Sequence, residues 1–551
     1  MTYAIGQVWC DMRPTVPQLL HTMTSLHGER PQIIDAGGAV SFAEVERRSA
    51  ELASGLLATG IGKGDKVAIL MENGADWVIC FFAAMRIGAV ATPLSTFAKP
   101  PELLKMLRQG DVKTILAGDR FLAIDFTASL EAALPGLAGH DGKTPLYLEE
   151  APYLRSIWVR GGQPRWAAGD YRALADAAGA QECRGILAAV EAEVTPADEA
   201  IIIFTSGTTS DAKAVLHSHG AMIRQALAIA GFTDVKPGDR FLVGMPFFWV
   251  GGIVMVLLPS GIHGAATVCA PAPSPQSALE TIRQQGITRS AMWMTQLAAM
   301  QALPDFKPED LANLRPAWAL QLADFGFATR EQTSNMLGMS ETFGPHSIMP
   351  IGTILSPEHQ GSYGYACAPD LERRVFDPET GQELPPGEEG ELWVRGHALM
   401  LGFYKRERSD VFTRDGFYRT GDRCRITSDG HLYFTGRTSE MIKTSGANVA
   451  PAEVEQALRP LPGVREAIVM GIADAVLGER VIAAVIMLPG SDFDEDAMKA
   501  ALREQIAGYK VPRAIVPLQE HEVPRTDAGK PKKPILAQAL AQRLAVDAAA
   551  T

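Results

Sequence analysis

The chain has 551 residues, of which 47% are apolar and 21% charged, a composition typical of globular proteins with several domains. Its formal net charge of −12 disfavours a nucleic-acid partner, because proteins that bind nucleic acids normally carry a basic face. Six scattered cysteines predict neither a zinc site nor a disulfide framework, and with no signal-peptide pattern or apolar run of spanning length we expect a cytoplasmic protein without a transmembrane segment.

Hydrophobic patterns in the first half of the chain alternate between helix and strand. Ser41 and Glu44 form a capping box ahead of an amphipathic run through residue 57. Further along, we expect strands at residues 67–71, 89–91 and 200–204, a helix at residues 77–86, and the same strand–helix–strand rhythm at residues 241–245, 254–258 and 265–268. This alternation favours an α/β fold in which helices cover parallel sheets.

A hydroxyl-rich loop follows the apolar strand at residues 200–204. It contains, in order, Thr205, Ser206, Gly207, Thr208, Thr209 and Ser210, and it ends at Lys213. Backbone N–H groups, hydroxyls and a lysine at the end of a buried strand suit an anionic phosphate. Alone, such a composition is more often an ordinary surface turn, so the assignment depends on partner residues elsewhere.

The sequence pattern changes in the second half of the chain. Pro/Gly turns and short strands around residues 381–396 indicate a small β-rich unit. After residue 440, strands at residues 467–472 and 481–487 and a helix at residues 494–507 indicate a compact α+β tail domain. We expect the alanine-rich last dozen residues to be frayed.

Four motifs follow the hydroxyl-rich loop in the second half of the chain. They are Gly338-Met339-Ser340-Glu341, Arg419-Thr420-Gly421-Asp422, Gly436-Arg437 continuing through Lys443-Thr444-Ser445-Gly446, and Pro524-Arg525-Thr526-Asp527-Ala528-Gly529-Lys530. Taken singly, Asp422 would be a turn residue and Lys530 an ordinary exposed lysine. Five motifs in one order are far more specific than any one of them.

In this order the motifs resemble the adenylate-forming superfamily, which includes acyl-CoA synthetases, peptide-synthetase adenylation domains and luciferases. The resemblance runs from about residue 41 to residue 533. It implies an α/β fold with a large N-terminal adenylation domain (residues 1–436) of layered α/β subdomains plus the small β-rich unit. A small mobile α+β C-terminal domain (residues 437–551) would follow and carry the catalytic lysine. The implied enzyme is an AMP-forming acid–thiol ligase, an acyl-CoA synthetase.

The resemblance also implies a role for each motif residue. The residues expected to bind ATP or AMP are Thr205, Ser206, Gly207, Thr208, Thr209, Lys213, Ser340, Asp422, Arg437 and Lys443. Glu341 would hold Mg²⁺, and Asp422 would accept hydrogen bonds from both ribose hydroxyls. Lys530, Glu341 and Thr205 would be catalytic. Ser439 would lie at the hinge between the domains, and Ser445 and Gly446 along the path of CoA.

The expected acyl pocket is apolar. It would include Phe248, Trp249 and Gly251, with Gly338 and Phe343 from the later motif. Large apolar side chains favour an aliphatic, alicyclic or aryl acid. No acidic residue occurs at residues 243–248 to bind the ammonium group of an amino acid. The predicted reaction is therefore ATP-dependent activation of an apolar acid to acyl-AMP, followed by transfer to CoA.

Some positions depart from the family pattern. Ser210, Ala212 and Ala214 replace the usual Gly, Pro and Gly, and Leu337 stands where a tyrosine usually stacks on adenine. The segment 314–334 is abbreviated. These departures motivate one alternative, a weakened nucleotide- or acyl-binding homologue. A second alternative is a ligase that loads a free carrier protein. The expected partners are a small carboxylic acid, ATP and CoA, and a homodimer is one alternative for the assembly.

Overall fold

The computed structural model describes residues 6–161, 164–177, 179–205, 213–292, 294–315, 336–437, 441–488, 490–525 and 531–550. The chain divides into two compact units. Unit 1 comprises Met1–Thr96, Met106–Phe204 and Ala214–Thr438, and unit 2 comprises Phe97–Lys105, Thr205–Lys213 and Ser439–Thr551. The predicted limits of residues 1–436 and 437–551, and the mobility of the second domain, stay predictions.

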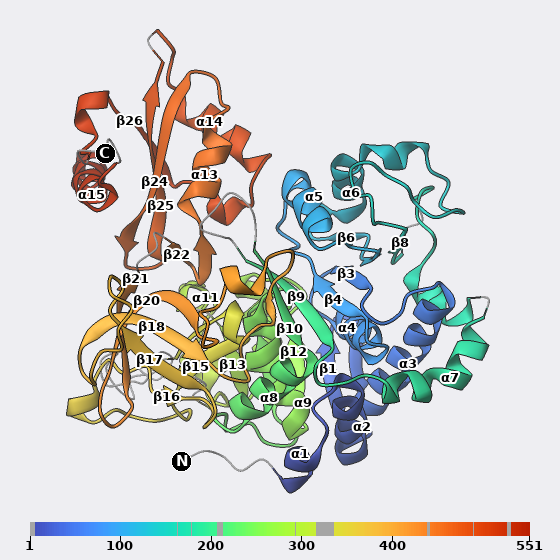
Figure 1. The fold of residues 1–551 in the computed structure, drawn as a ribbon. Coiled ribbons are helices and arrows are strands. Elements are labelled where there is room, and N and C mark those ends of the chain that lie inside the picture. Colours follow the sequence, from blue (N-terminus) through green and yellow to red (C-terminus); the bar gives the residue numbers. More distant parts are fainter. Residues whose placement is uncertain are drawn as a thin grey trace. The chain divides into compact units, whose positions relative to one another are not determined.

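Two α/β sheets form most of unit 1 (Figure 1). The larger has the strand order β19 (Gly402–Phe403), β10 (Lys213–Ser218), β9 (Glu199–Thr205), β4 (Val90–Pro93), β3 (Lys66–Leu70), β5 (Thr114–Ala117) and β8 (Ser156–Val159). The smaller has the order β13 (Arg289–Ala291), β11 (Arg240–Val243), β12 (Ala266–Cys269), β1 (Pro31–Asp35) and β2 (Gly38–Ser41). Strands β8, β5, β3, β4 and β9 are parallel, as are β13, β11, β12 and β1, as the strand–helix alternation predicts.

Helices lie between and around these sheets. The main ones are α2 (Val16–His27), α3 (Phe42–Ala58), α4 (Ala75–Arg86), α7 (Ala180–Ala192), α8 (His219–Ala230), α9 (Leu258–His263), α10 (Pro275–Gln285) and α11 (Met294–Gln301). The capping box is present, since Ser41 accepts from the backbone N–H of Glu44 at the start of α3. Smaller elements in the first part of the chain are α1 (Gln7–Asp11), α5 (Pro100–Gln109), α6 (Phe126–Ala133), β6 (Arg120–Phe121) and β7 (Ile124–Asp125).

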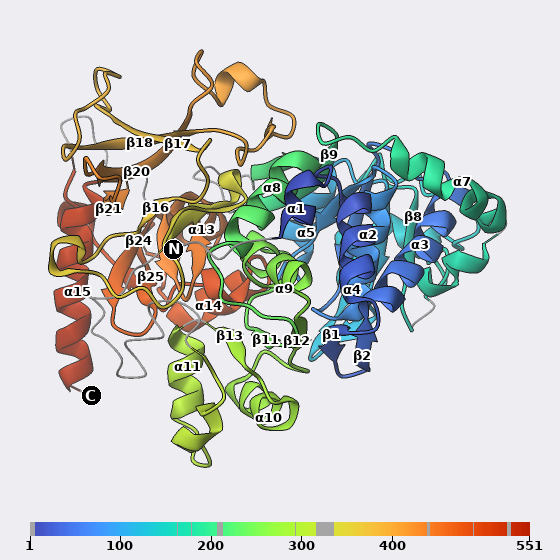
Figure 2. The same ribbon diagram turned by 90° about the horizontal axis from the view of Figure 1, so that it is seen from below.

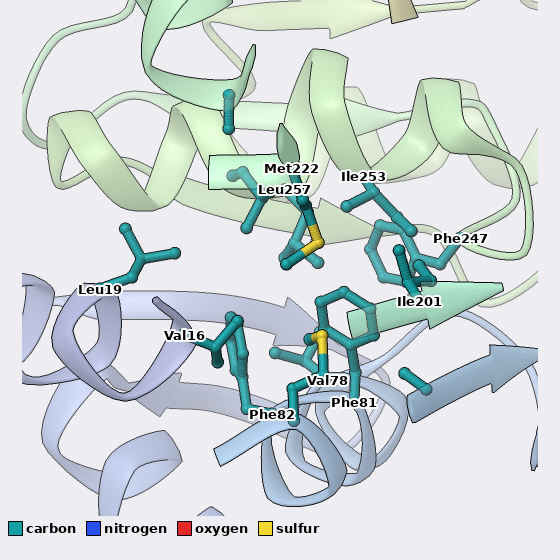
Figure 3. Packing of buried hydrophobic residues seen from close by; sticks show 14 of the residues in the cluster. Val16, Leu19, Val78, Phe81, Phe82, Ile201, Met222, Phe247, Ile253 and Leu257 are labelled. Atoms are coloured by element: carbon teal, nitrogen blue, oxygen red, sulfur yellow. The ribbon is translucent and has the colours of Figure 1, made fainter. Parts of the chain in front are cut away.

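The largest hydrophobic core joins the facing sides of the two sheets. Val78, Phe81 and Phe82 of α4 point toward Met222 of α8 and Leu257 (Figure 3). Eleven of the twelve residues of α4 are buried and only Asp76 is partly exposed, which explains why its apolar pattern runs round most of the helix. Helices α10 and α11 pack on the other face of the smaller sheet (Figure 2). No helix among the described residues is both long and apolar enough to cross a membrane.

A β-rich part of unit 1 follows the α/β sheets. Its four-stranded sheet has the order β17 (Glu372–Phe376), β18 (Glu389–Arg395), β20 (Tyr418–Ile426) and β21 (Leu432–Arg437). A smaller antiparallel sheet contains β14 (Leu337–Met339), β15 (Gly344–Ile348) and β16 (Tyr365–Ala366). The Pro/Gly turns and short strands expected around residues 381–396 predict this β-rich part.

Unit 2 contains a sheet with helices on both faces (Figure 1). Its order is β23 (Ala447–Val449), β22 (Ile442–Thr444), β25 (Gly478–Met487) and β24 (Val464–Asp474), with β26 (Ala514–Pro517) also paired to β25. Helices α13 (Pro451–Leu458) and α14 (Glu495–Arg503) cover one face, and α15 (Lys533–Ala550) covers the other. Leu536 and Leu540, in the first half of α15, are buried against β24 and β25, and the fraying of the last dozen residues stays a prediction.

Candidate active site

Glu341 lies in a tight turn between β14 and β15. The turn is a short 3₁₀ segment, Ser340–Thr342, closed by Phe343 at a left-handed φ of 48°. A Cβ atom on Gly338 would lie 2.4 Å from the carbonyl oxygen of Gly344, so only glycine allows this close approach of the two strands. The hairpin therefore fixes the backbone from which the Glu341 side chain projects.

Two contacts hold Glu341 from the β-rich sheet and its flanking loop. The Tyr418 hydroxyl donates to Oε1 of Glu341 at 3.1 Å. The backbone N–H of Met400 donates to the Glu341 carbonyl at 2.9 Å. Tyr418 is the first residue of β20, and its side chain is buried. These contacts fix the orientation of the carboxylate.

His217 supports the same turn from the larger α/β sheet. It lies on β10, and its Nε2 is 2.7 Å from the carbonyl oxygen of Ser340. Burial lowers the pKa of His217 to about 4, so the ring is neutral at pH 7 and its Nε2–H donates to that carbonyl. The ring also meets Phe343 edge-on, with centroids 5.0 Å apart. Sequence reasoning gave no role to His217.

Asp422 lies at an irregularity of β20. Opposite Glu391 and Trp393 the register of β20 shifts, so that extra residues, including Asp422, are bulged relative to β18. The Glu391 carboxylate stabilises this bulge by accepting from the backbone N–H of Gly421 at 3.2 Å and from the Arg419 guanidinium at 2.8 Å. Asp422 is fully buried and pairs across the ladder with Arg437 of β21.

The apolar stretch predicted to line the acyl pocket follows β11. Phe248 is buried, and Trp249 is half-buried and meets it edge-on at 5.5 Å. Asn73 clamps the preceding turn, because its Nδ2 donates to the Met245 carbonyl and its Oδ1 accepts from the Phe247 N–H. Gly251 then precedes a π-helical segment, Gly252–Leu257, a distortion that is common at functional sites. Asn73 was missed because it lies 172 residues from its partner.

The remaining predicted residues lie at the ends of the predicted phosphate loop, in unit 2 or outside the described part of the chain. Thr205 ends β9 and Lys213 begins the neighbouring β10, so they bracket the predicted phosphate loop. In unit 2, Ser445 and Gly446 form a two-residue turn between β22 and β23, with φ values of 49° and 79°. Lys443 precedes that turn, and its backbone N–H donates to Glu479. The residues that lie outside the described part are Ser206, Gly207, Thr208, Thr209, Ser439, Lys530 and the side chain of Arg437.

Two family models match the chain. The model described as AMP-binding enzyme matches residues 21–404, and that described as AMP-binding enzyme C-terminal domain matches residues 453–530. The chain belongs to the AMP-binding enzyme family. This confirms the resemblance to the adenylate-forming superfamily and the prediction of an AMP-forming acid–thiol ligase.

Similar proteins cover nearly the whole chain. An indoleacetate–CoA ligase from Aromatoleum aromaticum is 30% identical, covering 92% of this chain and 94% of the relative. A feruloyl-CoA synthase from an Amycolatopsis species is 28% identical, covering 90% and 92%. Among solved structures, an amide bond synthetase from Marinactinospora thermotolerans is similar with a TM-score of 0.76 and 25% identity, covering 94% and 99%. The predicted α/β fold, with a large N-terminal and a small C-terminal domain, is confirmed.

For a member of this family, the donor set around Glu341 fits a magnesium ion held together with nucleotide phosphates. Mg²⁺ prefers one or two carboxylates and keeps several waters. Glu341 is half-buried and Ser340 precedes it on the same turn, so a carboxylate and a hydroxyl come from adjacent residues. Among the described residues, the hydrogen bond from the Tyr418 hydroxyl to this carboxylate goes to Oε1. This leaves Oε2 as the oxygen that would face a cation.

Proposed function

We propose that the chain activates an apolar carboxylic acid with ATP and transfers the acyl group to CoA. In the first half-reaction the acid's carboxylate attacks the α-phosphorus of ATP, giving acyl-AMP and pyrophosphate. In the second, the CoA thiol attacks the acyl carbonyl, giving the thioester and AMP. The protein contributes positioning and charge stabilisation, because phosphorus needs no protein nucleophile.

One structural observation carries the assignment of the nucleotide site. Strand β20 holds Asp422, the predicted ribose partner, and its first residue, Tyr418, contacts Glu341, the predicted Mg²⁺ ligand. Two carboxylates that are 81 positions apart in sequence are thus tied to one strand, as a site for the ribose and the phosphates of one nucleotide requires.

The proposed acid is aryl or alicyclic. The buried Phe248 and half-buried Trp249 favour a flat or compact hydrophobic body. Two relatives are named for aromatic acids, indoleacetate and ferulate, which supports the same class.

Acid-dependent exchange of labelled pyrophosphate into ATP tests the first half-reaction. The panel should contain aryl, alicyclic and medium-chain acids, with amino acids as the comparison, and CoA is then added to the acids that support exchange. We expect exchange and a CoA thioester with aryl or alicyclic acids. Tight ATP binding without exchange on any acid would support the weakened homologue instead. Exchange without a CoA thioester, but with loading of a carrier protein or an amine, would overturn CoA as the acceptor.

Two variants separate the proposed roles. Asp422→Asn should weaken ATP binding by about tenfold or more, because a hydrogen bond to a charged group contributes about 1.5–3 kcal/mol. Lys530→Ala should abolish formation of acyl-AMP and leave the conversion of supplied acyl-AMP to thioester largely intact. Equal loss of both half-reactions in the Lys530 variant would contradict its role.

A further inference from the structure

A group of metal-ligand side chains lies at the turn of the β20–β21 hairpin. Asp429 and His431 belong to the turn between the two strands, and His359 ends a short 3₁₀ segment, Pro357–His359. One ligand atom from each of the three lies within 4.8 Å of the other two. Among the residues that the structure describes, this is the one such group of histidine, cysteine and carboxylate side chains. None of the three belongs to the predicted adenylation residues.

The distances within this cluster are close to those of a metal site. Oδ2 of Asp429 lies 3.3 Å from Nε2 of His359 and 3.9 Å from Nε2 of His431. Ligand atoms of a tetrahedral zinc site lie about 3.4 Å apart, given metal–ligand bonds of about 2.1 Å. The side chain of Asp429 is 51% exposed and that of His359 24%, so a cation can reach the cluster from solvent.

Outer hydrogen bonds orient two of the ligands. The Thr427 hydroxyl donates to Oδ1 of Asp429 at 2.5 Å, which leaves Oδ2 facing the histidines. The Ser362 hydroxyl lies 2.8 Å from Nδ1 of His431, so Nε2 of that ring is the atom turned toward Asp429. Partners of this kind fix the tautomer and the ring orientation of metal-binding histidines.

We propose that His359, Asp429 and His431 bind one divalent transition-metal ion of the Zn²⁺ class. Two imidazoles and one carboxylate suit such ions, whereas Mg²⁺ and Ca²⁺ prefer oxygen ligands. Water takes the fourth position, and the Tyr365 hydroxyl, 2.8 Å from Nε2 of His431, gives up that hydrogen bond when the metal binds.

Binding requires a movement of one ring. The His359 and His431 rings are stacked, with centroids 3.6 Å apart and planes inclined by 14°. Lone pairs lie in the ring planes, so two parallel rings do not direct them at one point. His359 is the ring that turns, because it is the more exposed of the two and its Nδ1 has no hydrogen-bond partner among the described residues. The ion then links the segment Pro357–His359 to the hairpin whose strands carry Asp422 and Arg437.

Calorimetric titration of the metal-free full-length protein with ZnCl₂ tests the proposal, in a buffer with excess Mg²⁺ to occupy oxygen-only sites. We expect one equivalent of Zn²⁺ to bind and to raise Tm. Co²⁺ should bind in the same place and give the intense visible absorption of a tetrahedral site. Asp429→Asn and His359→Gln should each weaken binding at least tenfold and abolish the shift in Tm. Both change exposed or half-exposed side chains, and their Tm values in EDTA report whether they fold.

Two control variants locate the ion. His521→Ala removes an exposed histidine far from the cluster in sequence, and Glu341→Gln removes the predicted Mg²⁺ carboxylate. Both should bind Zn²⁺ as the unaltered protein does. Equal Zn²⁺ affinity in the Asp429 and His359 variants and the unaltered protein would overturn the proposal. Loss of binding in the Glu341 variant alone would place the ion in the adenylation site and would also overturn it.

Discussion

Tyr418 and Glu341 come from different sheets of unit 1 and meet through a hydrogen bond of 3.1 Å between the phenolic hydroxyl and Oε1. The same turn is held from a third sheet, where His217 of β10 donates to the Ser340 carbonyl. A carboxylate fixed in this way loses little freedom when it binds a cation, so its supports should matter for catalysis as well as for folding.

The first prediction concerns the Tyr418 hydroxyl. Tyr418→Phe keeps the buried ring and removes the donor to Glu341. We expect kcat for ATP–pyrophosphate exchange to fall by about tenfold to a hundredfold and the Mg²⁺ concentration for half-maximal rate to rise, because loss of an outer partner costs about that much in affinity or activity. The Mg²⁺ dependence of exchange measures both effects.

Tyr404→Phe is the matched control for this prediction. Tyr404 also donates to a carboxylate, Oδ2 of Asp111, at 3.2 Å, but that carboxylate has no predicted catalytic role. Its loss should leave the Mg²⁺ dependence unchanged. A similar Mg²⁺ response in both variants would mean that Tyr418 acts through general stability.

The second prediction compares two glycines. Gly338→Ala would place a Cβ atom 2.4 Å from the Gly344 carbonyl oxygen, so the hairpin that carries Glu341 must open. Gly185 of α7 has no atom within 4 Å of such a Cβ and is exposed. We expect Gly338→Ala to lower Tm and abolish exchange. Gly185→Ala should stabilise the protein by about 0.5–1 kcal/mol, because alanine is the better helix former. Urea unfolding of both variants measures whether their changes in stability have opposite signs. A Gly338 variant with unchanged stability would contradict the strain argument.

Features encoded locally were predictable from the sequence, and those created by tertiary contacts were not. The capping box of Ser41 and Glu44 needs only neighbouring residues, and it is present at the start of α3. Asn73 clamps a segment 172 residues away, and no local pattern announces such a contact. The cluster of His359 and Asp429 likewise depends on which loop meets which hairpin.

The chain end and the candidate site illustrate the same limit. Leu536 and Leu540 dock the first half of α15 on the sheet of unit 2, a tertiary contact that no local pattern predicts. In the candidate site, the order of the motifs predicts Glu341 and Asp422 through the family pattern. Their dependence on Tyr418 and on the bulge beside Glu391 follows from strand register, which the motifs do not contain.

The third prediction concerns stability at acid pH. His219 is buried at the start of α8, where Nδ1 accepts from the backbone N–H of Val16 at 3.2 Å, and burial lowers its pKa to about 4. Its folded pKa is below the unfolded value of about 6.5, so the unfolded chain binds the proton first as pH falls. Stability should therefore decrease from pH 6.5 toward pH 4, with about 1.4 kcal/mol per pH unit from this histidine at most.

Urea unfolding of His219→Gln between pH 7.5 and pH 4.5 measures this contribution. The variant should be less stable at pH 7.5, because the Val16 N–H loses its acceptor. Its stability should nevertheless fall less steeply than that of the unaltered protein below pH 6.5, since carboxylates contribute equally to both curves. Parallel curves would show that His219 is not buried in its neutral form.

The fourth prediction concerns the loss of stability at alkaline pH that His21 should cause. His21 of α2 lies 3.1 Å from a carboxylate oxygen of Glu46 and 3.1 Å from one of Glu191, and hydrogen bonds to these two raise its pKa to about 9. A folded pKa above the unfolded value of about 6.5 means that its contribution is complete below pH 6.5 and is lost as pH rises through 9. Because the His21 side chain is 46% exposed, solvent screening limits the effect to about 1 kcal/mol or less.

His21→Gln should lower the stability of the protein at pH 6 and have no effect on it at pH 10. The control His521→Gln, at an exposed position, should change the stability at neither pH. A His21 variant equally destabilised at both pH values would show that the ring stabilises the protein by packing, and that its charge between α3 and α7 contributes nothing.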